Sequence, residues 1–472
     1  MEKEYVGLAE VPSKTRRPGK KLKDFVKPVP REQESDFRLE ELFISITDKK
    51  SHIEFGNEIF TRISKYENHE LSGQLHSIIR HPDMPRAAFK IFWDYLKSDK
   101  MAVAYVKNLA KDGTYYWVLA VVISHGSTYQ SIRLKPGSEL FEKVKVIYNK
   151  TLEFEKKEEK VSGKAAALAR SEDYMLELLN EAGFKDYDEF LLEALKSEIY
   201  NRIDKLNSKG VNLKRYVCKA APPELIDIAR HLKSLCIQQR VLNRIQKALY
   251  EHSDYILDLA HSILLLSLNA QIGSTKLDKS DISLSVVAEK MGEQSLVGEK
   301  QLLEMKESIN ELHKIGTNLN MHILLTTIQT EQTLVCYQES EQFPEQSNDF
   351  MYSYSEMIEQ VLDAYKPRLQ NIINDIARLP EVIKKIVTGI EELEKFLMVL
   401  RFIHITGKVE IARMSDNSNS FSTTFAELIE EVENAEMHVK ELSKVSSENK
   451  DIVNVYSDLS DKLTYLNSVL FK

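Results

Sequence analysis

Cysteine, proline and glycine are scarce in this chain of 472 residues, which contains 3, 12 and 16 of them. Cys218, Cys236 and Cys336 are far apart and odd in number, so we expect neither a disulfide framework nor a cysteine-based metal site. No apolar run reaches the roughly 18–20 residues that cross a bilayer, and the longest candidate, 263–272, contains Ser, Asn and Gln. The N-terminus also lacks the apolar segment of a secretory signal. We therefore expect a reduced, cytoplasmic protein without a membrane span.

The charge balance and several missing motifs exclude further classes. Lys and Arg number 64 against 72 Asp and Glu, a formal net charge of −8, whereas nucleic-acid-binding domains are usually basic. Glycine-rich phosphate loops and a nucleophile–base pair are absent, and no third metal ligand lies at a suitable spacing from the histidines. We therefore expect no nucleic-acid partner, no metal and no enzyme. The low glycine and proline content, with 29% charged residues, is typical of a helix-rich chain.

The first 150 residues divide into a tail and a domain of mixed secondary structure. Residues 1–35 are polar with a basic cluster at 14–23, which predicts a disordered tail, either a solvated linker or a contact for an acidic partner or a membrane surface. Residues 36–150 contain β-type runs around a helical, loop-rich insert at 57–100. The runs are 42–48, 102–110, 115–124 and 129–135. This pattern predicts a compact α+β domain.

Strand signals nearly vanish after residue 150. Segment 166–206 predicts two helices broken near Gly183, and we assign 151–221 as a helical connector. A seven-residue apolar series then runs without a miss, which predicts a long helix with a coiled-coil seam. Its members are Ile228, Leu235, Leu242, Leu249, Ile256, Ile263 and Ala270. A second helix with its own apolar positions follows a polar tip at 278–283, so residues 222–330 form a first helical hairpin.

The heptad pattern returns 137 residues later. The equivalent positions are Tyr365, Ile372, Leu379, Ile386, Leu393 and Leu400. We assign 331–350 as a linker and 351–472 as a second hairpin, whose first helix should be started, bent or interrupted by Pro367 and Pro380. Two hairpins in one chain can bury each other's seams, so we predict an antiparallel four-helix bundle formed within the chain.

Three stretches of the α+β domain carry a family resemblance. They are 46–60, 66–96, which contains the motif RHPDMP at 80–85, and 106–118, which contains KDGTYYWV. In this combination the domain resembles a PAS domain of the aerotaxis-receptor type. That family's domain is similar to a flavin-binding redox sensor, so the resemblance implies an FAD site. The matched positions are Asn57, Arg80, His81, Asp83, Phe89 and Trp93.

The chemistry of these residues fits a ligand pocket, although other roles stay open. An arginine such as Arg80 can pair with a phosphate or a ring carbonyl, and Phe89 and Trp93, four residues apart, share one helix face. Asp83 is alternatively a helix cap, and His81 an ordinary polar residue. The family has a second tryptophan where this chain has Met101. Haem, or an empty pocket, are the alternatives to FAD.

The two hairpin ends carry a second resemblance. Residues 268–291 and 405–428 align without gaps to the cytoplasmic signalling tip of methyl-accepting chemotaxis proteins. This resemblance implies that a chemotaxis histidine kinase and its coupling protein bind the tip. The matched partner-binding positions are Asn269, Glu410, Arg413 and Phe421. The family's turn glycines are replaced at both tips, and a plain coiled coil, in which Ala and Leu recur, is the alternative explanation.

The sequence thus predicts an α+β PAS domain plus long all-α helical hairpins that form an antiparallel four-helix bundle. One hypothesis is a soluble cytosolic sensor of redox state, oxygen or a small ligand in chemotaxis or energy taxis, with helices 166–206 passing the change to the bundle. The other is a non-sensing adaptor or structural component of a chemosensory or flagellar assembly, whose PAS pocket is empty.

Overall fold

The computed structural model describes residues 26–211, 216–274, 282–343, 349–413 and 419–471. They fall into two compact units. The first unit lies within Met1–Arg230 and Leu324–Pro367, and the second within His231–Ile323 and Arg368–Lys472. Within the described ranges, no helix combines the length and the apolar character that a membrane span requires.

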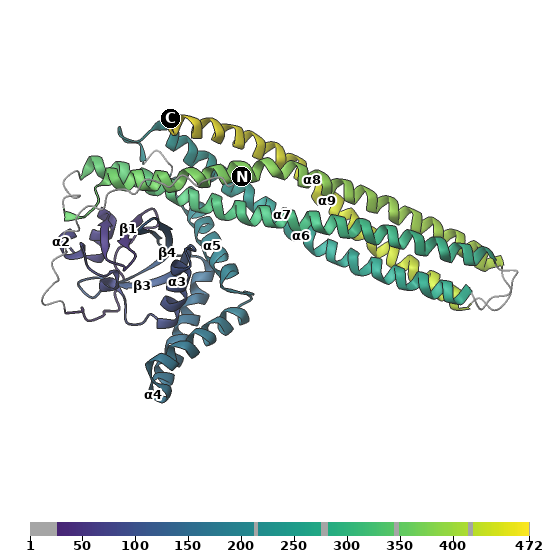
Figure 1. Ribbon diagram of the computed structural model, residues 1–472, viewed down its shortest axis with the longest axis horizontal. Coiled ribbons are helices and arrows are strands. Elements are labelled where there is room, and N and C mark those ends of the chain that lie inside the picture. Colours follow the sequence, from purple (N-terminus) through teal and green to yellow (C-terminus); the bar gives the residue numbers. More distant parts are fainter. Residues whose placement is uncertain (1–25, 212–215, 275–281, 344–348, 414–418, 472) are drawn as a thin grey trace, which may run out of the picture. The chain divides into compact units, whose positions relative to one another are not determined.

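A five-stranded antiparallel sheet with the order β2-β1-β5-β4-β3 forms the centre of the first unit (Figure 1). Its strands are β1 (Leu42–Asp48), β2 (Ile53–Gly56), β3 (Ala102–Leu109), β4 (Tyr115–His125) and β5 (Thr128–Leu134). The helices between β2 and β3 are α1 (Glu58–Ser64), α2 (Asn68–Leu71), the 3-10 helix η1 (His76–Ile79) and α3 (Arg86–Lys97). The four expected strands and the helical insert are confirmed. Strand β2 was not expected, because four residues are too few to show a period.

The turn between β3 and β4 requires a glycine at position 113. Gly113 has a φ of 91°, and a Cβ there would lie 2.2 Å from the backbone oxygen of Val29. Arg31 donates its backbone N–H to the Gly113 carbonyl at 2.7 Å. The end of the expected disordered tail, 1–35, therefore differs from the prediction, because backbone hydrogen bonds hold it along the β3–β4 turn. Residues 1–25 lie outside the described residues.

Two helices follow the sheet, α4 (Glu139–Glu181) and α5 (Tyr187–Ser208). The expected break near Gly183 is confirmed, and a further break at Gly163 (φ 79°, ψ 169°) interrupts α4. Helix α4 packs against α3, and α5 packs against β3 and β4. The Tyr105 hydroxyl of β3 donates to Glu198 of α5 at 3.0 Å. The connector helices are therefore packed directly on the sheet that they follow.

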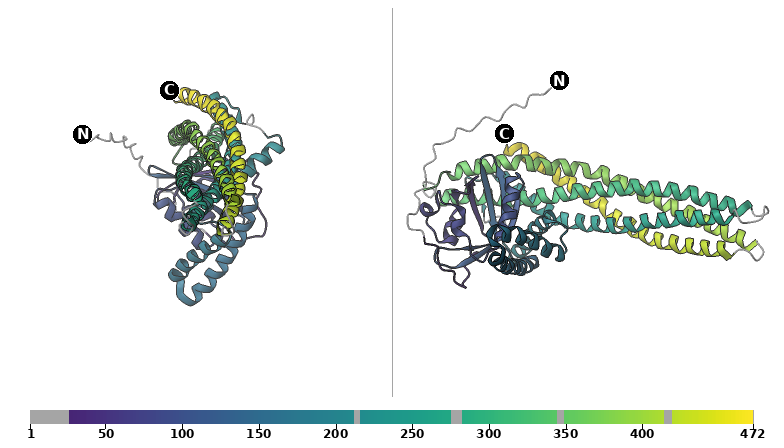
Figure 2. Two further views of the ribbon diagram at one scale, coloured as in Figure 1. Left: turned by 90° about the vertical axis from the view of Figure 1, so that its right-hand side faces the viewer. Right: turned by 60° about the horizontal axis from the view of Figure 1, so that its bottom comes forward.

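Four long helices complete the chain. They are α6 (Pro223–Ser274), α7 (Ile282–Gln342), α8 (Tyr354–Arg413) and α9 (Asn419–Leu470). In the second unit they lie side by side and alternate in direction (Figure 2). Heptad residues fill this core, each at most 1% exposed: Leu235, Leu242, Leu249, Ile372, Leu379, Ile386, Leu393 and Leu400. The predicted antiparallel four-helix bundle is confirmed, and its formation within one chain stays a prediction.

Two buried glutamines fix how the bundle helices pair. Gln239 of α6 donates to the Gly316 carbonyl of α7 at 3.0 Å and accepts from the Tyr456 hydroxyl of α9 at 2.8 Å. Gln246 donates to the Leu312 carbonyl at 2.7 Å. A Cβ at Gly316 would lie 1.9 Å from the Gln246 amide nitrogen, so a larger residue there would displace the Gln246 side chain and its hydrogen bond to Leu312. Buried polar groups of this kind specify one register of a helical bundle.

Two expectations about helix ends differ from the structure. The segment 331–350 was expected to be a linker, but α7 continues to Gln342, because in the first unit its side chains are buried almost all round. Pro367 and Pro380 neither start nor interrupt α8, which runs through both, so a bend is the expected effect that stays a prediction. Their rings are on exposed positions, and the buried residues on either side hold the helix together in spite of the lost backbone bonds.

Candidate functional site

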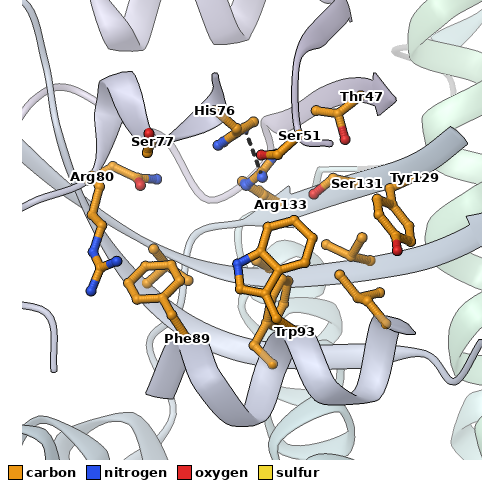
Figure 3. Close-up of a pocket in the computed structure, with 16 residues that line it drawn as sticks. Thr47, Ser51, His76, Ser77, Arg80, Phe89, Trp93, Tyr129, Ser131 and Arg133 are labelled. Atoms are coloured by element: carbon orange, nitrogen blue, oxygen red, sulfur yellow. Dashed lines mark hydrogen bonds between the residues drawn. The ribbon is translucent and has the colours of Figure 1, made fainter. Parts of the chain in front are cut away.

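A cavity of about 110 Å³ lies in the first unit between the sheet and the helices η1 and α3 (Figure 3). Its residues come from β1, η1, α3, β3, β4 and β5. In Figure 3, Phe89 and Trp93 rise from α3 on one side of the cavity, and His76 and Ser77 lie on the other. The cavity thus has an aromatic wall and a polar side, which is the usual arrangement of a small-molecule pocket.

The aromatic wall follows from the spacing of α3. Phe89, Phe92 and Trp93 lie within one turn, half-buried, and face the sheet. The Trp93 ring packs edge-on against Tyr129 of β5 with centroids 5.9 Å apart. At the end of the wall, the Arg80 guanidinium lies 3.9 Å from the centre of the Phe89 ring, a cation–π contact. Burial lowers the pKa of Arg80.

The polar side is organised by Arg133 of β5. Its Nη1 donates to Ser45 Oγ at 2.8 Å and its Nη2 to His76 Nε2 at 3.0 Å. Burial lowers the pKa of Arg133 to about 10, opposed by Tyr116. Burial, and then the charge of Arg133, hold the pKa of His76 well below its usual value. His76 is therefore neutral, and its Nε2 serves as the acceptor for the guanidinium.

Two polar atoms that line the cavity have no partner among the described residues. They are the Asn108 amide nitrogen on β3 and the Ser131 hydroxyl on β5, in side chains that are 2% and 3% exposed. An unpaired buried polar group costs about 1–3 kcal/mol. Such groups in a pocket wall are suited to a bound ligand that completes their hydrogen bonds.

The structure brings three of the six sequence-predicted cofactor residues to the cavity. Arg80, Phe89 and Trp93 line it, whereas Asn57, His81 and Asp83 are placed elsewhere. Met101, which occupies the place of the family's second tryptophan, does not line it either. The sequence reasoning missed His76, Asn108, Ser131 and Arg133. One feature of the sequence could have pointed to Arg133. It is a charged residue between two apolar residues, Ile132 and Leu134, of an expected strand.

His81 and Asp83 form a local cluster with β3. His81 is 2% exposed, its Nδ1 accepts the Asp83 backbone N–H at 3.1 Å, and its Nε2 has no partner in the described part of the chain. Burial and the nearby Lys107 lower the pKa of His81 to about 4. Asp83 pairs with Lys107 at 2.8 Å. This part of the RHPDMP motif therefore fastens the loop before α3 to strand β3.

Asn57 is fully buried at the junction of β2 and α1. Its Oδ1 accepts the N–H of Phe60, as an N-cap does, and also the N–H of Ile44 at 2.9 Å. Its Nδ2 donates to the Leu42 carbonyl at 3.0 Å and to Glu339 at 3.1 Å. Asn57 thus joins the sheet, α1 and the end of helix α7.

Glu339 is the α7 side of that junction. Besides the Asn57 amide, it accepts the Glu58 backbone N–H at 3.2 Å and the Tyr354 hydroxyl of α8 at 3.0 Å. Burial raises the pKa of Glu339 to about 7, and these hydrogen bonds oppose the rise. No signal in the sequence pointed to this contact, because Asn57 and Glu339 are 282 positions apart.

The expected tip residues are described only in part. Asn269 is exposed in α6, and Glu410 is half-buried in α8. Arg413 and Phe421 belong to α8 and α9, and their side chains lie outside the described residues. Among the residues that the structure describes, no group of three His, Cys, Asp or Glu side chains could hold a metal ion.

Comparison with known proteins identifies the domain that contains the cavity. Residues 53–134 match a family model described as the PAS fold. Over 110 residues, the chain is 40% identical to the aerotaxis receptor of Escherichia coli (strain K12), and the aligned part is 22% of each chain. The chain therefore spans about a fifth of the length of that receptor. The PAS resemblance is confirmed, and the long helices fit the signalling hairpins that were expected beyond it.

Proposed function

We propose that this protein is a sensor in taxis signalling, whose PAS cavity holds a ligand that changes the long helices. The observation that carries the proposal is the cavity itself, with a wall of Arg80, Phe89 and Trp93 and with buried, unpartnered donors at Asn108 and Ser131. It lies in the part of the chain that matches the PAS fold. The similar receptor is named for aerotaxis, which supports a role in taxis for this chain. We infer no catalytic role.

FAD is the ligand that we propose, and the donors of the cavity fit it. The buried donors of Arg133, Asn108 and Ser131 suit a ring rich in oxygen and nitrogen acceptors, and Trp93 and Phe89 offer flat surfaces to it. When bound, a flavin would supply a redox-dependent change of charge and hydrogen bonding. Since a void of about 150 Å³ holds a benzene and this cavity measures about 110 Å³, the half-exposed side chains of α3 must move to admit a tricyclic ring.

Haem fits this cavity less well. His76 is the imidazole that lines it within the described part of the chain. Its Nε2 already accepts a hydrogen bond from Arg133 at 3.0 Å. An axial bond to iron through that nitrogen would leave the buried guanidinium with one partner fewer, so we retain FAD as the proposal.

The first unit offers two direct contacts through which α7 can respond to the PAS domain. Glu339 of α7 bonds to the Asn57 amide next to β1. Glu331, two turns earlier, accepts from Arg202 of α5 at 2.6 Å, and Arg202 in turn donates to the Leu39 carbonyl before β1. We propose that a change in the cavity shifts β1 and α1 and is passed to α7 by these buried polar contacts. In this proposal, the connector helices and α7 together pass the change from the cavity to the bundle.

Trp93→Ala is the variant that tests the proposed ligand. We expect the purified wild type to show flavin absorbance and Trp93→Ala to lose most of it, because the largest ring of the aromatic wall is removed. Trp117→Ala is the matched control, since Trp117 packs against Phe141 and does not line the cavity. Asn57→Ala is a poorer probe, because Asn57 does not line the cavity and its loss removes the cap of α1. Flavin bound equally by both tryptophan variants would contradict the pocket assignment.

We propose a chemotaxis histidine kinase with its coupling protein as the partner, in the cytoplasm, where the three cysteines would stay reduced. Glu410→Ala and Arg413→Ala should weaken capture of these two proteins in a pull-down, because charge-assisted hydrogen bonds are lost. Lys408→Ala, an exposed charge on the same helix, is the control. Capture unchanged by either tip variant would argue against this interface.

The second candidate function is an adaptor with an empty PAS pocket. The small cavity volume favours it, because typical small-molecule sites measure roughly 300–1,000 Å³ and this one about 110 Å³. A colourless protein that takes up no flavin when reconstituted would favour the adaptor over the flavin sensor.

A further inference from the structure

Arg133 is a buried cation without a counter-charge. Its side chain is 6% exposed. Its contacts are the Ser45 hydroxyl at 2.8 Å, the neutral His76 at 3.0 Å and the Phe43 ring, whose centre lies 4.7 Å from the guanidinium. No carboxylate forms an ion pair with it among the residues described. A buried charge without a partner is costly, and a guanidinium cannot escape the cost by losing its proton.

The surroundings of Arg133 are rich in donors and poor in acceptors. No Asp or Glu lines the cavity in the described part of the chain, and a second guanidinium, Arg80, does. Ser131 lies two residues from Arg133 on β5, hence on the same face of the strand, and Figure 3 shows both at the cavity. The Ser131 hydroxyl is buried without a partner among the residues that the structure describes. What this side of the cavity lacks is a negatively charged acceptor.

We propose that Arg133 and Ser131 form a subsite for an oxyanion, a group whose negative charge lies on oxygen atoms. The inference rests on the function proposed above, in that the cavity holds a ligand, and it names the chemistry of one end of that ligand. Arg133 has five N–H donors, more than Ser45 and His76 engage, and pairs readily with two oxygens at once. A small carboxylate and the charged part of a flavin nucleotide both supply this chemistry.

The test compares the full-length wild type with Arg133→Gln, Ser131→Ala and the control Arg38→Gln, which changes an exposed arginine outside the cavity. Acetate, lactate and succinate are assayed by the rise in melting temperature against sodium chloride of equal ionic strength. FAD and riboflavin are assayed by fluorescence titration. We expect Arg133→Gln to lower the affinity for the probe about 10- to 100-fold. Ser131→Ala should lower this affinity less, and Arg38→Gln should leave it unchanged.

The probes distinguish the sources of the oxyanion. Arg133-dependent binding of a carboxylate indicates a small free acid, and Arg133-dependent binding of FAD but not of riboflavin indicates the phosphates. Without any probe, Arg133→Gln should melt at the wild-type temperature or above it, because an uncompensated buried charge has been removed. Ser131→Ala reports on the subsite if Arg133→Gln does not fold.

The outcomes also separate this inference from the flavin proposal. FAD bound equally by wild type, Arg133→Gln and Ser131→Ala would overturn the oxyanion subsite and leave the flavin sensor standing. Arg133-dependent succinate binding by a protein that takes no flavin would support the subsite and remove FAD from the proposed function. Failure of every probe to bind the wild type would overturn the subsite.

Discussion

Buried charged side chains of the first unit differ in how their charge is compensated. Glu331 is paired with Arg202 at 2.6 Å, so neither charge is alone. Arg133 has only neutral partners, as has Glu339, whose acceptor oxygens receive one amide, one backbone N–H and one hydroxyl. An arginine in this position keeps its charge, whereas a carboxylate can take up a proton near neutrality. We therefore expect the contact between the PAS domain and α7 to respond to pH through protonation of Glu339.

Stability of the first unit should depend on pH through Glu339. Its pKa is 4.5 in an unfolded chain and about 7 in the folded protein, so the folded state holds the proton more tightly. The stabilisation is complete below pH 4.5 and is lost as pH rises to about 7, by about 3 kcal/mol at 1.36 kcal/mol per pH unit. In urea unfolding, Glu339→Gln should remove this loss between pH 5 and pH 8.

Glu341→Gln is the control for this measurement, because Glu341 is an exposed carboxylate only two residues further along α7. It should keep the wild-type dependence on pH. A wild-type protein whose unfolding midpoint rises between pH 5 and pH 7, or a Glu339→Gln variant with the full wild-type slope, would contradict the assignment of Glu339 as the titrating group.

The residues of the cavity were predictable only where sequence neighbours form it. Phe89 and Trp93 could be assigned together because a helix places residues four apart on one face. Arg133 meets His76 across 57 positions, and Glu339 meets its amide partner on α1 across 282. These contacts form only after the strands have paired and α7 has packed in the first unit. No local sequence pattern therefore predicts them.

At the scale of elements, sequence periodicity predicted the long helices, but it did not predict where burial extends a helix beyond the periodic pattern. The heptad positions 228–249 of α6 and 365–400 of α8 are buried, as their seven-residue spacing indicated. The continuation of α7 through 331–342 was missed because this stretch is buried on nearly every side and so loses the amphipathic period. The continuation of α8 through its two prolines was missed because tertiary packing overrides a local preference.

Pro380 should be a point of low stability in α8. A proline in a helix interior lacks the N–H of one backbone hydrogen bond and costs about 3 kcal/mol relative to alanine. Since Pro380 is exposed in the second unit, replacing it disturbs no core packing. We expect Pro380→Ala to stabilise this part of α8 by roughly 1–3 kcal/mol, seen as slower amide hydrogen exchange around residue 380.

Lys384→Ala, one turn further along α8 and also exposed, is the matched control and should leave exchange nearly unchanged. Unchanged or faster exchange in Pro380→Ala would show that the proline ring contributes to the native helix rather than weakening it.

At the scale of the whole molecule, the 137-residue repeat explains why one chain suffices for the bundle. A single hairpin would leave the apolar seams of both its helices open on one side. Here the second hairpin covers them, and Gln239 of the first hairpin is bonded to Tyr456 of the second. The same chain thus supplies both halves of a bundle that a single-hairpin protein could complete only by pairing with a second copy.

The protein should therefore be a monomer, with a mass near the 54.4 kDa of one chain. Light scattering after size-exclusion chromatography measures this mass directly, and it should stay constant over about a hundredfold range of concentration, since an intrachain bundle is not subject to mass action. Tyr456→Phe removes the hydroxyl that joins the hairpins and should lower the melting temperature without changing the mass. A mass near twice that of the chain, together with melting that depends on concentration, would show that the four helices come from two chains.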